Sequence, residues 1–269
     1  MAEVLAWLAS NPGLPAVELA CRSIDVIESA LHVFSPEEVC FSFNGGKDST
    51  VVFHLLRAAC LRRARADAAT DADADAAAAE GAEEAARALL GRVRMVYFEV
   101  EGNFPEVEGF MEDTCHEYKL ELLRLPPFKQ GLERLIEEFG LRAVLIGTRA
   151  TDPDGRGLEH FSPTTPGWPP MMRVSPALRW DYAAVWTFLR GCNLPFCSLY
   201  ADGFTSLGVR ATSRPNPALA RGGAGAGFRP AWELSDGEQE RAGRAPRARP
   251  PPSGGGPSAG PASAAAACS

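Results

Sequence analysis

The chain has 269 residues with 27 Lys and Arg against 34 Asp and Glu, a formal net charge of −7, and 46% of its residues are hydrophobic. This acidic balance argues against a general nucleic-acid-binding protein, because such domains are normally basic. No apolar run reaches the roughly 18 residues of a membrane-spanning helix, and residues 1–11 lack the pattern of a secretory or transit peptide. We therefore expect a cytoplasmic protein without a membrane or nucleic-acid partner.

The charges are unevenly distributed along the chain. Residues 95–140 hold 11 acidic and 4 basic side chains, whereas residues 141–269 hold 14 basic and 9 acidic ones. An anionic ligand is therefore more favourably placed against the second half. The seven cysteines include no Cys-x-x-Cys pair, which argues against both a disulfide framework and a zinc site.

Segments of helical periodicity alternate with short apolar runs. The predicted helices are 16–34, 50–61, 105–118, 128–139 and 181–190, and the predicted strands are 39–43, 93–100, 120–125 and 143–146. This alternation predicts an α/β fold with a mainly parallel sheet and helices on both faces. Two stretches, 148–178 and 195–243, are rich in Pro and Gly, and loops of that length usually carry function.

Two segments differ from the rest in composition. Residues 62–92 are rich in Ala and Asp with almost no apolar stripe, and we expect an insertion that is at most partly helical. Residues 249–269 consist mainly of Pro, Gly, Ser and Ala, which predicts a disordered tail. Residues 1–248, which include that insertion, are long enough for a single domain with a C-terminal loop-rich extension.

A glycine pair lies between the first predicted strand and the next helix, in the run Phe43-Asn44-Gly45-Gly46-Lys47-Asp48-Ser49-Thr50. Backbone amides next to such glycines, together with a helix N-terminus, suit phosphate oxygens. The run is not a Walker A loop, because Phe41 stands at the position of its first glycine and Asp48 follows the lysine. The alternative is a simple strand-to-helix turn with a side-chain cap.

The glycine run is similar to the loop of the ATP-pyrophosphatase superfamily. Seven further motifs follow in order: GTRATDP (147–153), FSPTTPGWP (161–169), RVSP (173–176), YADGFTSLG (200–208), NPAL (216–219), RPAWEL (229–234) and ERAGR (240–244). Together they resemble the eukaryotic single-domain FAD synthases (FMN adenylyltransferases), in the 3′-phosphoadenylyl-sulfate (PAPS) reductase-like branch of that superfamily. The resemblance implies an adenine nucleotide alpha hydrolase-like fold.

The resemblance implies the reaction ATP + FMN → FAD + pyrophosphate, with Mg²⁺ as cofactor, and it assigns roles to particular residues. The implied catalytic residues are Asn44, Asp48, Asp152, Arg241 and Arg244, with Asp48 as the candidate magnesium ligand. The implied ATP-binding residues are Ser42, Phe43, Asn44, Gly45, Gly46, Lys47, Asp48, Ser49, Glu99 and Gly147. The implied flavin-binding residues are Arg149, Thr151, Asp152, Thr165, Trp168, Arg173 and Trp180.

Several of these assignments have alternatives. Arg241 and Arg244 could form a solvated cluster with the two arginines that follow them, and Arg149 could be a surface partner of a nearby aspartate. Trp168 and Trp180 could be core residues. Thr165 stands where the family usually has Asp, which implies a changed hydrogen bond near the flavin.

A rival interpretation is a sulfonucleotide reductase of the same superfamily. That enzyme needs a reactive cysteine in an electropositive setting, and Cys268 lies in an alanine run without one. The expected partners are therefore the small molecules ATP and FMN, and the protein is expected to be a monomer or a weak oligomer.

Overall fold

The computed structural model describes residues 1–68, 76–222 and 226–245. The predicted tail at 249–269 lies outside the described residues, as does part of the expected insertion. Among the described residues, no helix is long and apolar enough to cross a membrane.

A six-stranded sheet with the order β3-β2-β1-β4-β6-β5 forms the centre of the fold. All neighbours are parallel except β5, which runs antiparallel to β6 at the edge. The four predicted strands are confirmed, and two further strands lie within the stretch expected to be loop. The strands are β1 Val39–Ser42, β2 Arg94–Phe98, β3 Leu122–Leu125, β4 Ala143–Leu145, β5 Phe161–Pro163 and β6 Met172–Val174.

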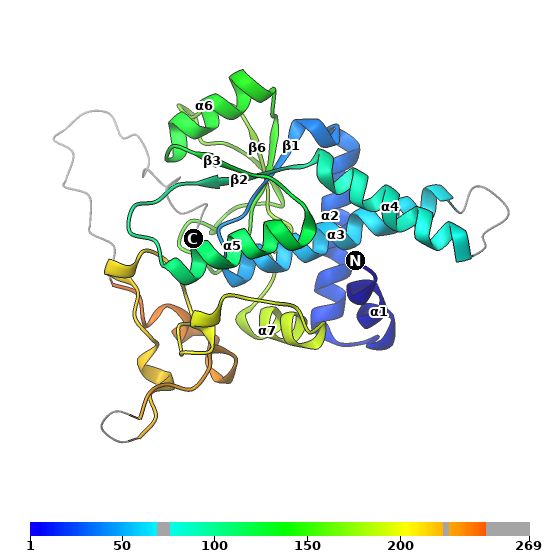
Figure 1. Cartoon of the computed structure of the whole chain (residues 1–269). Coiled ribbons are helices and arrows are strands. Elements are labelled where there is room, and N and C mark those ends of the chain that lie inside the picture. The colour runs from blue at the N-terminus through cyan, green and yellow to red at the C-terminus, as the bar shows by residue number, and fades with distance from the viewer. Residues whose placement is uncertain (69–75, 223–225, 246–269) are drawn as a thin grey trace.

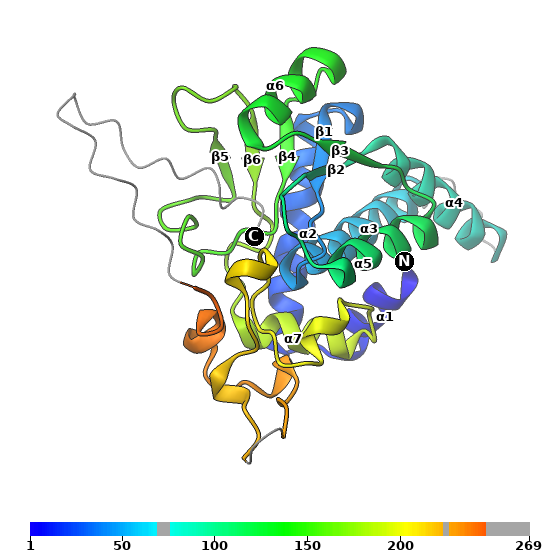
Figure 2. The same ribbon diagram turned by 60° about the vertical axis from the view of Figure 1, so that its left-hand side comes forward.

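Helices cover both faces of the sheet, as predicted (Figures 1 and 2). They are α1 Ala2–Ser10, α2 Pro15–Val33, α3 Lys47–Ala68, α4 Ala76–Arg92, α5 Pro105–Tyr118, α6 Phe128–Phe139 and α7 Tyr182–Gly191. Side chains alternate along β1, so that Val39 and Phe41 join the large core under α2, α3, α5 and α7, whereas Cys40 faces the smaller core under α6. The phosphate-loop candidate therefore leaves a strand that is buried on both faces.

The expectation of at most partial helix at 62–92 is wrong for the described residues. Helix α3 continues to Ala68, and α4 packs against it with Ala82, Ala86 and Leu90 buried. These three residues are spaced four apart, which places them on one helix face. The stripe was missed because alanine is weakly hydrophobic, although its small side chain allows close helix packing. Helix α1 was not predicted either, and its Val4 and Leu8 are buried against the same core.

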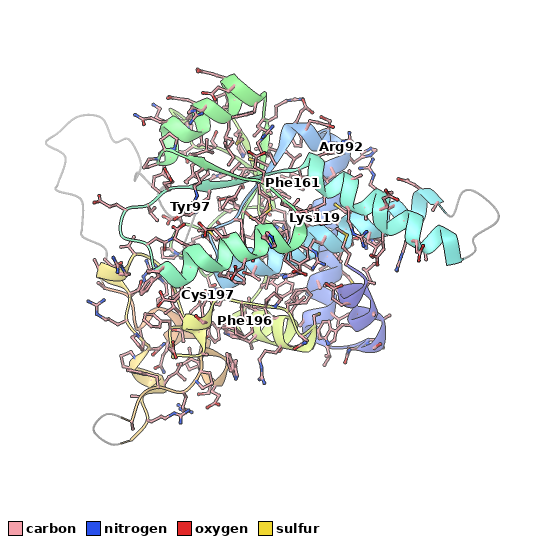
Figure 3. All side chains as sticks on the ribbon, in the orientation of Figure 1. Arg92, Tyr97, Lys119, Phe161, Phe196 and Cys197 are labelled. Atoms are coloured by element: carbon pink, nitrogen blue, oxygen red, sulfur yellow. The ribbon has the colours of Figure 1, made fainter. Side chains whose placement is uncertain are left out.

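The chain after α7 forms a loop-rich extension with short 3₁₀ helices. An aromatic cluster holds it to α7, because the Trp186 ring lies 5.2 Å from Phe196, 5.2 Å from Tyr200 and 5.7 Å from Trp232. The labelled Phe196 lies in this region in Figure 3. A further anchor is Tyr182 Oη on α7, which donates to the Ala231 carbonyl at 2.8 Å. The extension is therefore attached to the domain near the carboxyl ends of the strands.

Candidate active site

The glycine-rich run connects β1 to α3 and is shaped by its own asparagine. Asn44 Oδ1 accepts hydrogen bonds from Gly46 N at 3.0 Å and from Ser49 Oγ at 2.7 Å. Gly45 has φ +69°, a conformation that favours glycine, and a Cβ there would lie 3.0 Å from the Val107 side chain on α5. The asparagine and the glycines therefore hold a tight turn at the N-terminus of α3.

The end of β4 packs directly on this turn. A Cβ at Gly147 would lie 2.8 Å from Ser49 N and 3.0 Å from the carbonyl carbon of Asp48. Only glycine allows the two backbones to approach so closely. The chain that leaves β4, with Arg149 and Asp152, is thereby brought to the start of α3.

A buried ion network joins three distant segments at this point. Lys47 Nζ contacts Asp48 Oδ2 at 2.9 Å and also Glu240 Oε1. Arg149 Nε lies 3.0 Å from Asp48 Oδ1, and Arg149 Nη2 lies 2.7 Å from Glu240 Oε1 and 3.7 Å from Asp152 Oδ1. Lys47 and Arg149 are 2% and 1% exposed. Because Arg149 is buried, the alternative of a surface partner is excluded.

The network sets the charge states of its two aspartates. Burial alone would raise the pKa of Asp48, but the positive charges of Arg149 and Lys47 outweigh it and hold that pKa below its ordinary value. The pKa of Asp152 is raised, by burial and by the negative charge of Asp48, against the opposing effect of Arg149. Asp48 is therefore a firmly ionised carboxylate, whereas ionisation of Asp152 is opposed by its surroundings.

Tyr200, which the sequence analysis did not assign to the site, contacts the backbone of the glycine-rich run at the start of α3. Tyr200 Oη accepts a hydrogen bond of 2.7 Å from Lys47 N, and burial raises the pKa of its hydroxyl. The backbone amide of Lys47 is thus directed at Tyr200. Tyr200 begins the 200–208 motif, so the sequence marked it as a candidate. Its contact with Lys47, 153 positions away, could not be predicted from the sequence.

The C-terminal arginines lie at the end of the same extension. Arg244 Nη1 donates to the Leu207 carbonyl at 2.7 Å and lies 3.3 Å from Ser206 Oγ. Gly208 makes room for this guanidinium, because a Cβ there would lie 2.2 Å from Nη2. Arg241 ends the 3₁₀ helix η6, Gly237–Arg241, directly after Glu240. Arg244 is thus held by the 206–208 segment, which a solvated cluster would not require.

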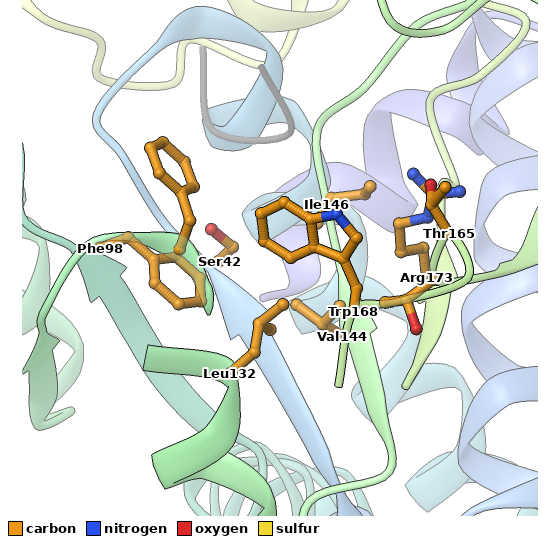
Figure 4. A pocket seen from close by; sticks show the side chains of 10 residues that line it. Ser42, Phe98, Leu132, Val144, Ile146, Thr165, Trp168 and Arg173 are labelled. Atoms are coloured by element: carbon orange, nitrogen blue, oxygen red, sulfur yellow. The ribbon is translucent and has the colours of Figure 1, made fainter. Parts of the chain in front are cut away.

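An apolar pocket opens beside the loop, between α6 and the turn that joins β5 to β6 (Figure 4). The space between its lining side chains is about 530 Å³, a figure that includes open solvent. Figure 4 shows the Trp168 ring between Phe98 on one side and Thr165 and Arg173 on the other. The residues that line it are Ser42, Phe98, Phe128, Leu132, Val144, Ile146, Thr164, Thr165, Trp168 and Arg173.

This pocket combines residues expected for two ligands. Ser42 was expected at the nucleotide, and Thr165, Trp168 and Arg173 at the flavin. The structure brings all four to one cavity, where Ser42 ends β1 directly before the glycine-rich run. The aromatic and aliphatic side chains among its lining suit a planar ring.

Comparison with known proteins gives a consistent family. A model of the phosphoadenosine phosphosulfate reductase domain matches residues 128–215. The chain is 35% identical over 224 residues to a probable FAD synthase of Schizosaccharomyces pombe, covering 82% of this chain and 77% of the relative. The chain belongs to the FAD synthase family. It is also 32% identical to the flavin adenine dinucleotide synthase of Saccharomyces cerevisiae, over 76% of this chain and 68% of that protein.

Solved structures of the same family share the fold. The crystal structure of yeast FAD synthetase in complex with FAD matches with a TM-score of 0.72 and 26% identity, over 91% of this chain and 96% of that one. Candida glabrata FMN adenylyltransferase in complex with FMN and the ATP analogue AMPCPP matches with a TM-score of 0.70 and 25% identity, over 90% and 96%. The FAD synthase fold and the expected α/β architecture are thereby confirmed.

Three of the residues expected at the site of this FAD synthase family member do not line the pocket. Trp180 is buried in the helical core, where its Nε1 donates to Ser23 Oγ at 2.9 Å and its ring packs on Phe188, so it does not line the pocket. Glu99 is exposed just beyond the end of β2, and Thr151 is exposed two residues after Arg149. Trp180 is therefore a core residue, which was the alternative interpretation from the sequence.

The carboxylates of the ion network can hold magnesium only together with ligands from a bound nucleotide. The described residues contain no cluster of three or more His, Cys, Asp or Glu side chains arranged for a metal. Both carboxylate oxygens of Asp48 contact a cation, Lys47 or Arg149. Mg²⁺ commonly uses one or two carboxylates, with waters and substrate phosphates as its other ligands. The residues present therefore fit an ion carried largely by nucleotide phosphates.

The cysteines in the described part of the chain do not support the rival reductase. Burial raises the pKa of Cys60 and of Cys192 to about 12 in each case, so these thiols resist ionisation. Cys268 lies outside the described residues.

Proposed function

We propose that this chain transfers the AMP moiety of ATP to FMN, giving FAD and pyrophosphate. The observation that carries the proposal is the meeting of the phosphate-type loop, two buried cations and an aromatic pocket at one edge of the sheet, in a member of the FAD synthase family. In open α/β sheets, ligands bind at the carboxyl ends of the strands, where these features lie.

The chemistry requires positioning rather than a general base. An oxygen of the FMN phosphate attacks the α-phosphorus of ATP, the new O–P bond forms, and the bond to the β-phosphate oxygen breaks as pyrophosphate leaves. The phosphate monoester has a second pKa of about 6, so the nucleophile is already mostly dianionic near neutral pH. Catalysis then depends on bringing two anions into line and stabilising the charge on the leaving group.

The buried cations supply that stabilisation. Lys47 and Arg149 are held by carboxylates in a site of low exposure, where positive charges act more strongly than in water. Arg241 and Arg244 lie at the end of the extension, directly after Glu240, and a guanidinium fork matches phosphate oxygens. We assign Lys47 and the loop to the ATP phosphates, and the two arginines to the α-phosphate and the FMN phosphate.

Magnesium completes the proposed site. Mg²⁺ would neutralise phosphate charge, and Asp48 would hold it through a coordinated water, since both carboxylate oxygens already contact cations. Asp152, which hydrogen-bonds Arg149 N through Oδ2 at 2.7 Å, would help to shape the loop around the reacting phosphates.

The pocket would hold the flavin ring against Trp168. Aromatic faces suit the planar isoalloxazine, and Thr165 offers a hydroxyl at the place of the family's usual carboxylate. This difference implies a neutral hydrogen bond to the flavin. The cytoplasmic location, the lack of nucleic-acid or membrane partners and the monomeric or weakly oligomeric state stay predictions from the sequence.

The experiment incubates the purified protein with ATP, FMN and Mg²⁺ and measures FAD by chromatography. FAD is expected in proportion to time, and replacement of FMN by riboflavin, which lacks the phosphate nucleophile, should give none. The Asp152→Ala variant should lose activity while its thermal unfolding stays cooperative. A wild-type protein that binds an ATP analogue but makes no FAD would refute the proposal.

A further inference from the structure

The strongest unassigned feature of the site is a carboxylate in the extension. Glu240 is only 8% exposed, and both of its oxygens are used: Oε1 contacts Lys47 Nζ and lies 2.7 Å from Arg149 Nη2, and Oε2 lies 2.5 Å from the same nitrogen. Neither the sequence motifs nor the resemblance gave this residue a role. It touches the two cations that the proposed function assigns to phosphates.

The contacts form a closed ring of alternating charge. Lys47 contacts Asp48 and Glu240, and Arg149 contacts the same two carboxylates. Two positive and two negative charges thus balance within the ring. An ammonium group has three N–H donors, so two carboxylates together direct its third N–H. A guanidinium is planar, and contacts at Nε and Nη2 set the plane of the whole group.

The backbone that carries Glu240 is anchored as well. The Glu240 carbonyl accepts a hydrogen bond of 2.6 Å from Thr205 Oγ1, and the preceding carbonyl, of Gln239, accepts one of 2.7 Å from Asn216 Nδ2. Asn216 also donates to Thr205 Oγ1 at 2.9 Å. Asn216 and Thr205 are 0% and 1% exposed. Buried hydrogen bonds to the main chain of Gln239 and Glu240 therefore fix the position of the Glu240 backbone.

The position of Glu240 in the chain links the two halves of the site. Arg241 follows it directly, and Arg244 lies four residues later on the same anchored segment. Glu240 is thus the side chain through which the arginine-bearing segment contacts the loop of α3 and the chain that follows β4. A change in its charge alters both the direction of the cations and the attachment of this segment.

We propose that Glu240 is a positioning residue for adenylyl transfer, which directs Lys47 and Arg149 toward the reacting phosphates and registers Arg241 and Arg244 against the ATP loop. This inference rests on the proposed function. Because Lys47 and Arg149 keep their positive charges when the Glu240 charge is removed, attraction for the ATP phosphates is kept or increased. Alignment for in-line displacement is lost, however. Loss of Glu240 therefore lowers kcat and leaves nucleotide binding largely intact.

The test compares Glu240→Gln with Glu238→Gln, a matched change on the same 3₁₀ helix at an exposed position. Binding of AMPCPP, turnover of ATP and FMN, and thermal unfolding are measured for the wild type and both variants. We expect kcat of E240Q to fall by about 100-fold, as for a misplaced reacting group, with AMPCPP affinity unchanged or higher. E238Q should match the wild type in all three measurements.

Two results would overturn the role of Glu240. One is a folded E240Q with a kcat close to that of the wild type. The other is a parallel loss of kcat and AMPCPP binding that follows the unfolded fraction, since a purely structural residue behaves in that way. If E240Q does not fold, Glu240→Asp carries the same comparison with the charge kept and the reach shortened. A wild-type chain that makes no FAD would instead count against the proposed function.

Discussion

Replacing Arg149 with methionine tests whether the buried ion network stabilises the site as the contacts indicate. Methionine keeps much of the apolar stem of the arginine but removes its charge and its donors. The change leaves Asp48 and Glu240 buried without their shared partner, and only Lys47 between them. It also removes the guanidinium next to Asp152.

The expected loss of stability follows from the burial of the partners. Removing one member of a buried, hydrogen-bonded ion pair typically destabilises a protein by about 3–5 kcal/mol. For a domain of this size, each kcal/mol lowers Tm by about 2–4 °C, so Tm should fall by about 6–20 °C. The exposed Arg179→Met serves as the control and should stay within about 0.5 kcal/mol of the wild type.

The pH dependence gives this prediction a second signature. In the wild type, the folded-state pKa of Asp48 lies below its unfolded value, so its ionised form contributes stability above that unfolded value, and the contribution is lost as pH falls through the folded pKa. In the variant, burial acts without Arg149 and raises the folded pKa of Asp48. The destabilisation is then present at neutral pH and is relieved on acidification.

The assay is thermal unfolding of both proteins at neutral pH and near pH 5, with FAD formation measured in parallel. The gap in Tm between the wild type and R149M should be largest at neutral pH and should narrow at the lower pH, and R149M should make no measurable FAD. A gap that is absent, or that widens on acidification, would refute the electrostatic account of the network.

Three further changes probe the neighbouring parts of the site. Gly147→Ala places a methyl 2.8 Å from the backbone at the start of α3, so it should lose about 1–3 kcal/mol of stability in thermal unfolding and weaken AMPCPP binding. Gly109→Ala, inside α5 with open space around it, should instead keep its stability or gain up to about 1 kcal/mol. Trp168→Ala should weaken FMN binding by about 10-fold, measured by flavin fluorescence, and unchanged FMN affinity would place the ring elsewhere. Asp152→Asn should not lose stability at neutral pH, because burial and Asp48 oppose ionisation there. Its rate of FAD formation should nevertheless fall by about 100-fold or more, and a rate near that of the wild type would contradict its assigned role.

The local sequence pattern was sufficient to predict four of the six strands and the glycine-rich run that follows β1. The predicted bounds of α5 and α6 agree with the structure, because Pro105 marks the start of α5 and Gly140 caps the end of α6 in a left-handed conformation. Strands β5 and β6 were missed. They have three residues each, like β4, but their sequences FSP and MRV form no buried apolar run such as the AVL of β4. Pairing of β6 with β4 and of β5 with β6 stabilises them.

Four of the ten residues that line the pocket were named from the sequence, and the apolar side chains from β2, α6 and β4 were missed. Trp168 lies within the motif 161–169 and Trp180 four residues after the motif 173–176, yet the first lines the cavity and the second packs in the helical core. What separates them is the partner of the indole N–H. Trp180 has a buried hydroxyl, Ser23 Oγ, at 2.9 Å, from a residue 157 positions away. No pattern within the chain indicates such a partner.

The same reasoning explains why the charge balance of the site could not be completed from the sequence. The distribution of charge placed an anionic ligand against the second half, and Lys47, Arg149 and the C-terminal arginines were all identified as candidates. A buried cation must, however, be paired with an acidic side chain, and that acidic residue can be far away in the sequence. Asp48 is adjacent to Lys47, but Glu240 is 193 residues away. The sequence therefore indicates which cationic residues are candidates for phosphate binding. Only the fold shows that Glu240 contacts Lys47 and Arg149.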